Sequence, residues 1–270
     1  MDKKILWPVL ALLVIGLIAI FYPRRASEPP VPADLPEPPV AETPDFTQQP
    51  DPEPAPAFVA EEAPEPLPPL PELDESDAEA RAALAEVASP DLVERHLVAD
   101  GLVRKLVSTV DNLAGETIWM KTRVVPAQPG LFQVGGPEDE QVIAPDNYER
   151  YTPLVRLVEA TDTAQLVAAY QRHYPLLQQA YEELGYPGRQ FHNRALEVID
   201  HLLSTPTVEG PIRLERPHVM YKFADPELEA LSSGQKMLLR IGPEHAAVIR
   251  NKLIEFRAAL EDLADETSAE

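Results

Sequence analysis

Residues 162–206, "DTAQLVAAYQRHYPLLQQAYEELGYPGRQFHNRALEVIDHLLSTP", contain two long helical patterns separated by one short turn. On both sides of the turn, the stripe positions recur at intervals of three or four residues, which places them on one face of a helix. The first stripe comprises Leu166, Tyr170, His173, Leu177, Tyr181 and Leu184, and the second comprises Phe191, Ala195, Val198 and Leu202. The sequence therefore predicts two consecutive helices in a mainly α-helical fold.

The ends of these two helices carry start and stop signals. Asp162 is an N-cap residue, with Gln165 at the third position of the helix. Gly185 follows the last position of the first stripe, where glycine commonly ends a helix. Proline cannot donate a backbone hydrogen bond, so Pro206 stops the second helix. Residues 185–188, Gly-Tyr-Pro-Gly, are predicted to form the turn.

Three further helices are predicted upstream of this pair. Ser76 and Glu79 form a capping box for a helix that follows Ser76. Residues 89–115 predict a second helix, which starts at a Ser-Pro cap and ends at a glycine. Residues 116–145 are rich in glycine and proline and are expected to hold at most short extended pieces. A third helix is predicted around residues 148–159.

Downstream, residues 211–223 have two short alternating runs, each led by a proline, which predict a small hairpin or two edge strands. Asp225 caps a helix that is expected to end at residues 232–234, and residues 235–241 are expected to form a short apolar turn. The last helix starts at residues 242–244. Its apolar seam comprises Ala246, Ile249, Leu253, Phe256, Leu260 and Leu263. Because this seam covers fewer than three heptads, we expect it to pack within the molecule and not in a coiled coil.

These elements define an α-rich globular domain over residues 74–264, followed by a frayed tail over residues 265–270. The first segment of the chain, residues 1–22, contains 18 consecutive uncharged residues over 5–22. A helix of that length spans about 27 Å, which matches the hydrocarbon core of a bilayer.

Trp7 and Tyr22 stand at the two ends of this segment, where aromatic rings anchor a helix at the membrane interface. A cleaved signal peptide is the alternative, but no small-residue cleavage site follows the apolar run. The sequence therefore predicts an uncleaved single-pass anchor that contacts the lipid bilayer. Basic residues flank it almost equally, with Lys3 and Lys4 before it and Arg24 and Arg25 after it. Long domains are translocated largely regardless of charge, so we expect a bacterial inner-membrane protein whose bulk is periplasmic.

Residues 23–73 contain seventeen prolines and no glycine. They also contain eleven acidic residues and two arginines, a net charge of −9. Proline prevents helices and sheets from propagating and like charges extend the chain, so this segment is predicted to be a disordered linker with a bias to polyproline II. At about 3.1 Å per residue, it could extend on the order of 160 Å. It would act as a tether, or alternatively as a docking track for domains that recognise proline.

The sequence contains a partial match to a nucleotide-binding signature. Residues 231–235, "LSSGQ", differ at one position from the L-S-G-G-Q signature of ABC-type ATPases. Such an enzyme also needs a phosphate loop after a buried strand. The nearest candidate, residues 115–122, places Met120 at the obligatory second glycine and follows a helix. A side chain there blocks the backbone nest that cradles phosphate, so no nucleotide partner is expected.

Composition excludes other classes of function. The 270-residue chain has a formal net charge of −22, and an acidic surface repels the phosphate backbone, so no nucleic-acid partner is expected. It has no cysteine, which excludes disulfides, thiol nucleophiles and thiolate metal sites. None of its six histidines are paired at the i, i+4 spacing of a helical metal site, and there is no G-x-S-x-G elbow. We therefore expect no metal and no cofactor, and assign no catalytic residue.

One cluster is a candidate binding site. Tyr186, Arg189, His192 and Asn193 surround the Gly/Pro turn at the start of the second helix. Free amide donors, the positive end of the helix dipole and an arginine together can bind an anion or a carboxylate. The alternative is a capped turn on which Arg189 is merely solvated.

Several runs resemble the bacterial family known as domain of unknown function 3014. The resemblance covers roughly residues 80–260 and is carried by "AYEELGYP", "VIDHLL" and "LEALSSGQKMLLRIGPE". It implies a short head, one apolar helix, a proline-rich linker and an α-rich domain, and it implies no activity. We therefore expect a membrane-tethered binding, adaptor or scaffold module of the cell envelope, whose partner is an envelope protein or cell-wall material. The alternative is an envelope hydrolase or transferase with its site near residues 186–193.

Overall fold

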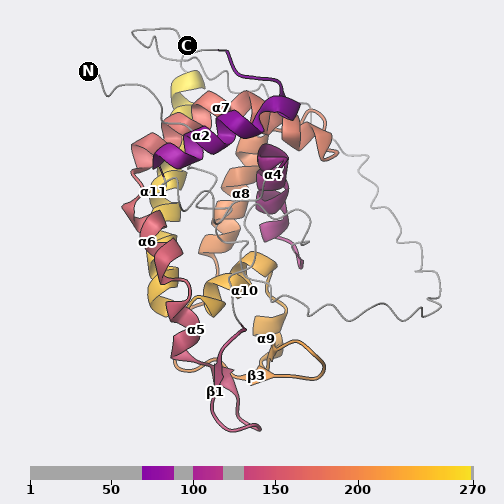
Figure 1. The fold of residues 1–270 in the computed structure, drawn as a ribbon, viewed down its shortest axis with the longest axis vertical. Helices are drawn as coiled ribbons and strands as arrows, with labels where there is room; N and C mark the ends of the chain where they lie inside the picture. Colours follow the sequence, from indigo (N-terminus) through magenta and orange to yellow (C-terminus); the bar gives the residue numbers. More distant parts are fainter. Residues whose placement is uncertain (1–68, 88–99, 118–130, 269–270) are drawn as a thin grey trace, which may run out of the picture.

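The two helical patterns of the central stretch are present as α7 (Thr163–Glu183) and α8 (Phe191–Leu203). The computed structural model describes residues 69–87, 100–117 and 131–268, which form a mainly helical domain with two small sheets (Figure 1). The Asp162 carboxylate accepts a hydrogen bond from Gln165 N at 2.9 Å, so the predicted cap is confirmed. The apolar stripe of α8 is completely buried, as expected from its spacing.

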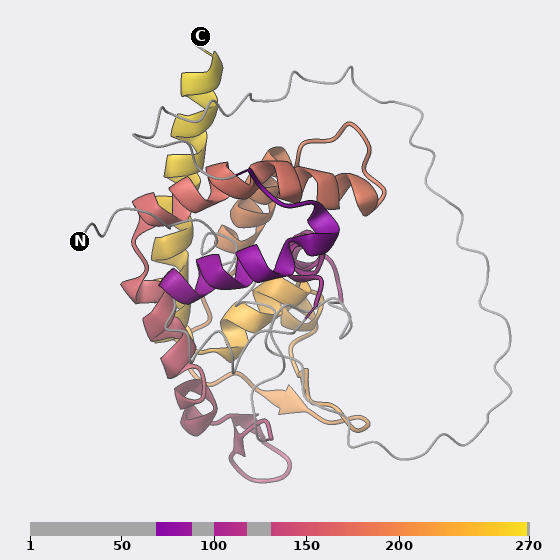
Figure 2. The ribbon, with the colours of Figure 1, turned by 45° about the horizontal axis from the view of Figure 1, so that its top comes forward.

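Helices α4 (Leu102–Leu113) and α11 (Pro243–Ser268) complete the main bundle together with α7 and α8. In Figures 1 and 2, α11 runs along the side of the molecule, and α7 crosses near the ends of α4 and α8. The predicted seam of α11 packs against α6, α7, α8 and α10, so the expected intramolecular packing is confirmed. The helix continues to Ser268, four residues beyond the predicted domain end, since its last turns contain only good or tolerated helix formers.

The domain begins with a 3₁₀ turn (Leu73–Glu75) and helix α2 (Asp77–Val87). Leu73 is buried and Leu70 packs against the core, so packing begins within the last residues that the sequence assigned to the linker. Asp77 ties α2 to α4, because its two carboxylate oxygens accept hydrogen bonds from Gly101 N and Leu102 N, each at 2.7 Å.

The sequence predicted one helix over residues 89–115, and this is wrong at its centre. Gly101 has a φ of +64°, a left-handed conformation that starts α4 at the next residue. Glycine adopts this conformation without steric cost, and Asp77 supplies the cap that α4 lacks locally. The predicted Ser-Pro start of that helix lies outside the described residues.

A second predicted helix is also divided. Instead of one helix around residues 148–159, the chain forms α5 (Pro145–Glu149) and α6 (Thr152–Ala160). Pro153 lies in the first turn of α6, where a helix does not need the amide hydrogen that proline lacks. A single helix running from α5 into α6 would need it, so the chain forms two helices. Asn147 of α5 is buried, and its side chain donates to Arg240 O at 3.1 Å.

The prediction that residues 232–234 end a helix is wrong, because they begin one. Helix α9 is a single turn (Pro226–Glu229), and α10 (Ser233–Arg240) follows immediately. The Ser232 hydroxyl accepts a hydrogen bond from Gln235 N at 3.2 Å, and the Gln235 side chain accepts one from Ser232 N at 3.3 Å. This capping box turns the expected apolar turn into a helix.

The cap can be tested by substitution. Replacing Ser232 by alanine is expected to lower the free energy of unfolding by about 1 kcal/mol, because Gln235 N loses its acceptor. Ser232→Asp keeps an acceptor at this position and should retain most of the stability. Urea denaturation of the three proteins measures the difference. Equal losses for alanine and aspartate would show that the cap does not stabilise α10.

Two small antiparallel sheets lie at the end of the molecule away from α7 (Figure 1). One pairs β1 (Val134–Gly135) with β2 (Val142–Ile143), and the other is the predicted hairpin, β3 (Leu214–Glu215) with β4 (Lys222–Phe223). The two sheets are joined through β2 and β3 by the hydrogen bonds Ile143 N to Ile212 O (3.1 Å) and Leu214 N to Gln141 O (2.8 Å). A second, smaller apolar cluster fills this end, comprising Ile143, Ile212, Leu214, Phe223 and Leu239.

In the part of the chain that the structure describes, no helix combines the length and the apolar character needed to cross a membrane. The predicted anchor, with Trp7 and Tyr22, lies outside the described residues, as does the linker up to residue 68.

Candidate ligand-binding face at the α7–α8 turn

The turn between α7 and α8 is held in shape by glycines and by one glutamine. Gly185 and Gly188 have φ values of +107° and +74°, which only glycine adopts readily. The Gln178 side chain donates to Arg189 O and accepts from Phe191 N, each at 2.8 Å. The first amide of α8 is thus satisfied by Gln178, and the turn is fixed to the helix that precedes it.

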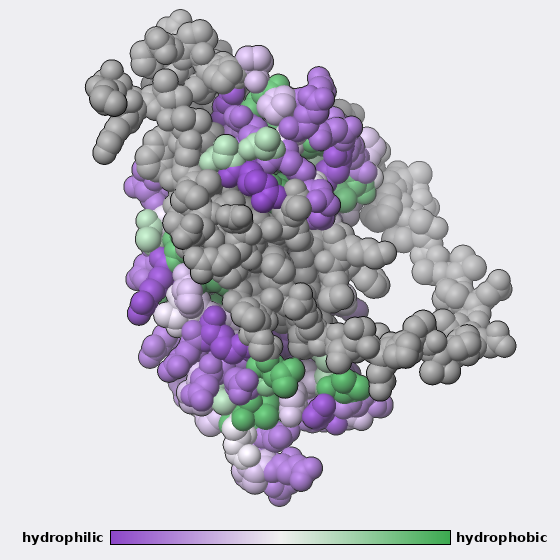
Figure 3. Space-filling view, viewed as in Figure 1, coloured by the Kyte–Doolittle hydropathy of each residue, from purple (hydrophilic) through white to green (hydrophobic). Residues whose placement is uncertain are grey.

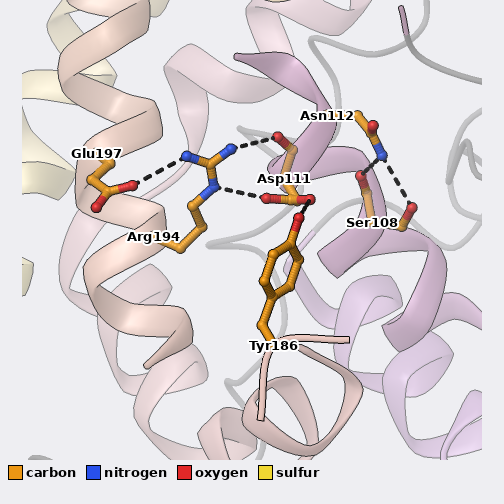
Figure 4. Close-up of polar contacts among 6 residues, drawn as sticks. All are labelled: Ser108, Asp111, Asn112, Tyr186, Arg194 and Glu197. Atoms are coloured by element: carbon orange, nitrogen blue, oxygen red, sulfur yellow. Dashed lines mark hydrogen bonds and ion pairs between the residues drawn. The ribbon is translucent and has the colours of Figure 1, made fainter. Parts of the chain in front are cut away.

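Tyr186 lies flat against the end of α7. Its ring stacks on the ring of Tyr181 with centroids 4.7 Å apart and an interplanar angle of 22°. Its hydroxyl donates to the Asp111 carboxylate of α4 at 3.2 Å (Figure 4). Burial raises the pKa of Tyr186, and the nearby charge of Asp111 raises it further. Tyr186 is therefore a neutral donor at physiological pH that connects the turn to α4.

Arg194 of α8 also binds Asp111, from the other side (Figure 4). Its Nε donates to the carboxylate at 2.7 Å, and one of its terminal nitrogens donates to Asp111 O at 3.0 Å. A second terminal nitrogen binds Glu197 at 3.1 Å. Burial alone would lower the pKa of Arg194, but the hydrogen bond and charge of Asp111 raise it above its usual value. The pair is therefore a charged link between α4 and α8.

The four predicted site residues do not converge on one point. Arg189 and Asn193 are exposed, and Tyr186 is partly buried beside them. His192 is buried in the core, where its Nδ1 lies 3.2 Å from the hydroxyl of Tyr170. The exposed face of this turn therefore consists of Arg189 and Asn193 next to the half-buried Tyr186, and it does not include the imidazole.

The sequence did not indicate the two residues that organise this face. Asp111 and Arg194 are 83 positions apart, and no pattern in the sequence connects them. The one signal that could have indicated Asp111 is its place on α4. That helix is short and buried on most sides, and an acidic side chain in such a position needs a partner. Nothing in the local pattern identified which basic residue would supply it.

The "LSSGQ" segment is fully engaged in packing within the chain. Ser233 N donates to Gly115 O at 2.8 Å, and Ser233 Oγ donates to Asn112 O at 3.0 Å. Gly234 lies against Leu113 and Leu202. These contacts bind the start of α10 to the end of α4 and account for the composition of this segment. Within the described residues, no group of three or more His, Asp or Glu side chains could hold a metal ion.

The stability of the domain should depend on pH through the buried His192 and the half-buried His201. Burial lowers the pKa of His192, and burial together with the nearby charge of Arg194 lowers that of His201. Below about pH 6.5 the unfolded chain takes up protons at these positions more readily than the folded chain. The free energy of unfolding should therefore fall as the pH drops from 7.5 to 5. The fall should be smaller in His192→Gln, and smaller again when His201 is also replaced. Urea denaturation at a series of pH values measures it. If the free energy of unfolding fell equally with pH in all three proteins, these histidines would not be its cause.

The family described as "Protein of unknown function (DUF3014)" matches residues 102–257. This range includes α4, α8 and the turn, and it agrees with the resemblance carried by the sequence motifs. Neither the curated proteins nor the solved structures contain a match to this chain.

Proposed function

Since the chain belongs to the family described as "Protein of unknown function (DUF3014)", which carries no activity with it, we propose a function from the molecule's own parts. The protein is a membrane-tethered binding module of the bacterial cell envelope, and it serves as an adaptor or scaffold. Residues 5–22 anchor it in the inner membrane, the proline-rich segment up to residue 68 is the tether, and the helical domain binds the partner in the periplasm.

One observation carries the binding role. The α7–α8 turn presents Arg189 and Asn193 on a support that does not depend on them, since Gln178 and the Asp111–Arg194 pair fix its shape. An exposed arginine suits a carboxylate, which it can bind through paired hydrogen bonds, and the exposed amide of Asn193 follows four positions later. A preorganised turn favours binding because less loop entropy is lost when the ligand binds. The partner we propose is a carboxylate-bearing envelope protein or cell-wall peptide.

The position of His192 favours binding over hydrolysis. An imidazole that acts as a general base must lie within hydrogen-bond reach of the proton it removes. His192 is instead buried against Tyr170 on the inner side of α8, whereas its neighbour Asn193 is exposed. The exposed face therefore offers donors and a cation, which are groups that bind a ligand.

A C-terminal dual reporter tests the proposed placement of the domain. An alkaline phosphatase fused after residue 270 of the full chain should be active, and a fluorescent protein that matures only in the cytoplasm should stay dark. A truncated chain that starts at residue 23 is the matched control and should give the reverse pattern. Cytoplasmic reporter activity from the full chain would overturn the periplasmic placement.

A further inference from the structure

The sheet end of the molecule carries an exposed apolar surface. Val219, at the tip of the β3–β4 hairpin, is 71% exposed, and Leu131 is 78% exposed. The rings of Phe132 and Tyr221 lie beside one another with centroids 6.0 Å apart. Figure 3 shows hydrophobic residues gathered near this lower end of the molecule, with hydrophilic residues beside them. We define the sheet-end surface as Leu131, Phe132, Val219, Tyr221 and the basic side chains of the hairpin.

This surface is also locally basic on an acidic protein. The hairpin over residues 211–223 has three basic residues, Arg213, Arg216 and Lys222, and one acidic residue, so its net charge is +2, whereas the whole chain carries −22. The Arg216 guanidinium lies over the Tyr221 ring, 5.3 Å from its centroid, and its Nε donates to Val219 O. Arg213 forms an exposed ion pair with Glu140 at 3.4 Å. Aromatic rings, an apolar tip and the guanidinium of Arg216 thus lie together.

One segment of the chain has the complementary chemistry. Residues 42–62, "ETPDFTQQPDPEPAPAFVAEE", carry six acidic residues, five prolines and no basic residue. They also contain Phe46 and Phe58, the two aromatic residues of the linker. Proline-rich segments bind to aromatic-lined surfaces because their polyproline II conformation is already formed and little entropy is lost. The carboxylates would pair with Arg216 and Lys222.

The segment can reach the surface from its point of attachment. The chain enters the core at Leu70, and Phe46 lies 24 residues earlier. At about 3.1 Å per residue in polyproline II, these 24 residues span about 74 Å, the 16 residues from Pro54 span about 50 Å, and the 12 residues from Phe58 span about 37 Å. Helix α11, which runs along most of the length of the molecule in Figure 1, is about 39 Å long at 1.5 Å for each of its 26 residues. Residues 42–54 can therefore reach the sheet end, whereas Phe58 cannot. A tethered segment also has an effective concentration in the millimolar range, so that weak contacts suffice to hold it.

We propose that residues 42–54, which include Phe46 and four of the six acidic residues, dock onto the sheet-end surface of the same molecule. The docked linker folds back along the domain and shortens the tether, and its release extends it. This docking is separate from the proposed binding role, since the sheet-end surface lies at the opposite end of the domain from the α7–α8 turn (Figure 1). It requires neither the membrane orientation nor the envelope partner to be as proposed.

A photo-crosslinking amino acid placed at Val219 in the full chain, purified in detergent, tests the proposal. After irradiation and digestion, mass spectrometry should find crosslinks from residue 219 to peptides within residues 42–54. The same amino acid at Ile254, which is 54% exposed on α11, is the control and should give none. Mixing labelled and unlabelled chains separates crosslinks within one molecule from crosslinks between two.

Two sets of variants identify the chemistry of the contact. Arg216→Glu combined with Lys222→Glu should lower the crosslink yield about threefold to tenfold, because each exposed ion pair contributes weakly. Phe46→Ala should lower it at least as much. Each variant should keep the unfolding midpoint of the parent chain. Crosslinks only between different chains, only to residues 118–130, or only to detergent would overturn the proposal, as would a yield that neither set of variants changes.

Discussion

Replacing Gly234 by alanine is expected to lower the free energy of unfolding by about 2 kcal/mol, because the site has no room for a Cβ atom. A Cβ there would lie 2.5 Å from Leu202 Cδ2 and 2.9 Å from the main-chain oxygen of Leu113. The leucine side chain can rotate away, but the Leu113 oxygen belongs to the last turn of α4 and moves only with that helix. The better helix propensity of alanine, about 1 kcal/mol, offsets part of the cost, and Gly234→Val should lose more.

The matched control is Gly115→Ala. A Cβ at Gly115 would meet only the Asn112 main-chain oxygen, at 3.4 Å, so this variant should stay within about 0.5 kcal/mol of the parent chain. Urea denaturation of both variants measures the contrast. Equal stabilities would contradict the close approach of α10 to α4 and α8, on which the arrangement of the helices depends.

Asp111→Ala is expected to cost about 2 to 3 kcal/mol, because it removes the acceptor of two partners at once. The side chains of Arg194 and Asp111 are 27% and 14% exposed, so water replaces the lost carboxylate only in part. Arg194 retains its bond to the main-chain oxygen of residue 111, and Tyr186 loses the acceptor that the structure gives its hydroxyl. A double-mutant cycle with Arg194→Leu should show a coupling energy between the two positions.

Asp200→Ala is the control for this experiment. Asp200 also pairs with an arginine, Arg257, at 2.5 Å, but on the exposed surface, where ion pairs are screened and contribute little. Its unfolding midpoint should be indistinguishable from that of the parent chain. If Asp111→Ala were equally mild, the pair would not hold α4 to α8, and the support proposed for the α7–α8 turn would be lost.

Helices α7, α8 and α11 could be predicted from the sequence because each has a long apolar stripe and a recognisable start. The errors lie where two signals compete within a few residues. Ser232-Ser233-Gly234 resembles a helix end because of its glycine, but the serine followed three positions later by Gln235 is a capping box. Gly101 interrupts a continuous apolar pattern because a distant side chain, Asp77, caps the helix that follows it.

The candidate binding face was predicted only in part, for a different physical reason. Its exposed residues lie within five positions of one another, so that a turn at a helix start was enough to indicate Arg189 and Asn193. Its support is tertiary, since Asp111 reaches Arg194 and Tyr186 across 83 and 75 positions. Helical periodicity describes one face of one helix, and it does not determine which neighbouring helix will lie against that face.

Site-directed crosslinking in living cells tests most directly whether this domain is a tethered binding module that works through the α7–α8 turn. A photo-crosslinking amino acid at Asn193 of the full chain should yield one discrete envelope adduct. The same amino acid at the exposed Glu227, on α9, should not yield it. Adding Arg189→Glu to the chain with the photo-crosslinking amino acid at position 193 should abolish the adduct while leaving the unfolding midpoint unchanged. The same adducts from both positions, or an adduct that survives Arg189→Glu, would contradict the proposed function.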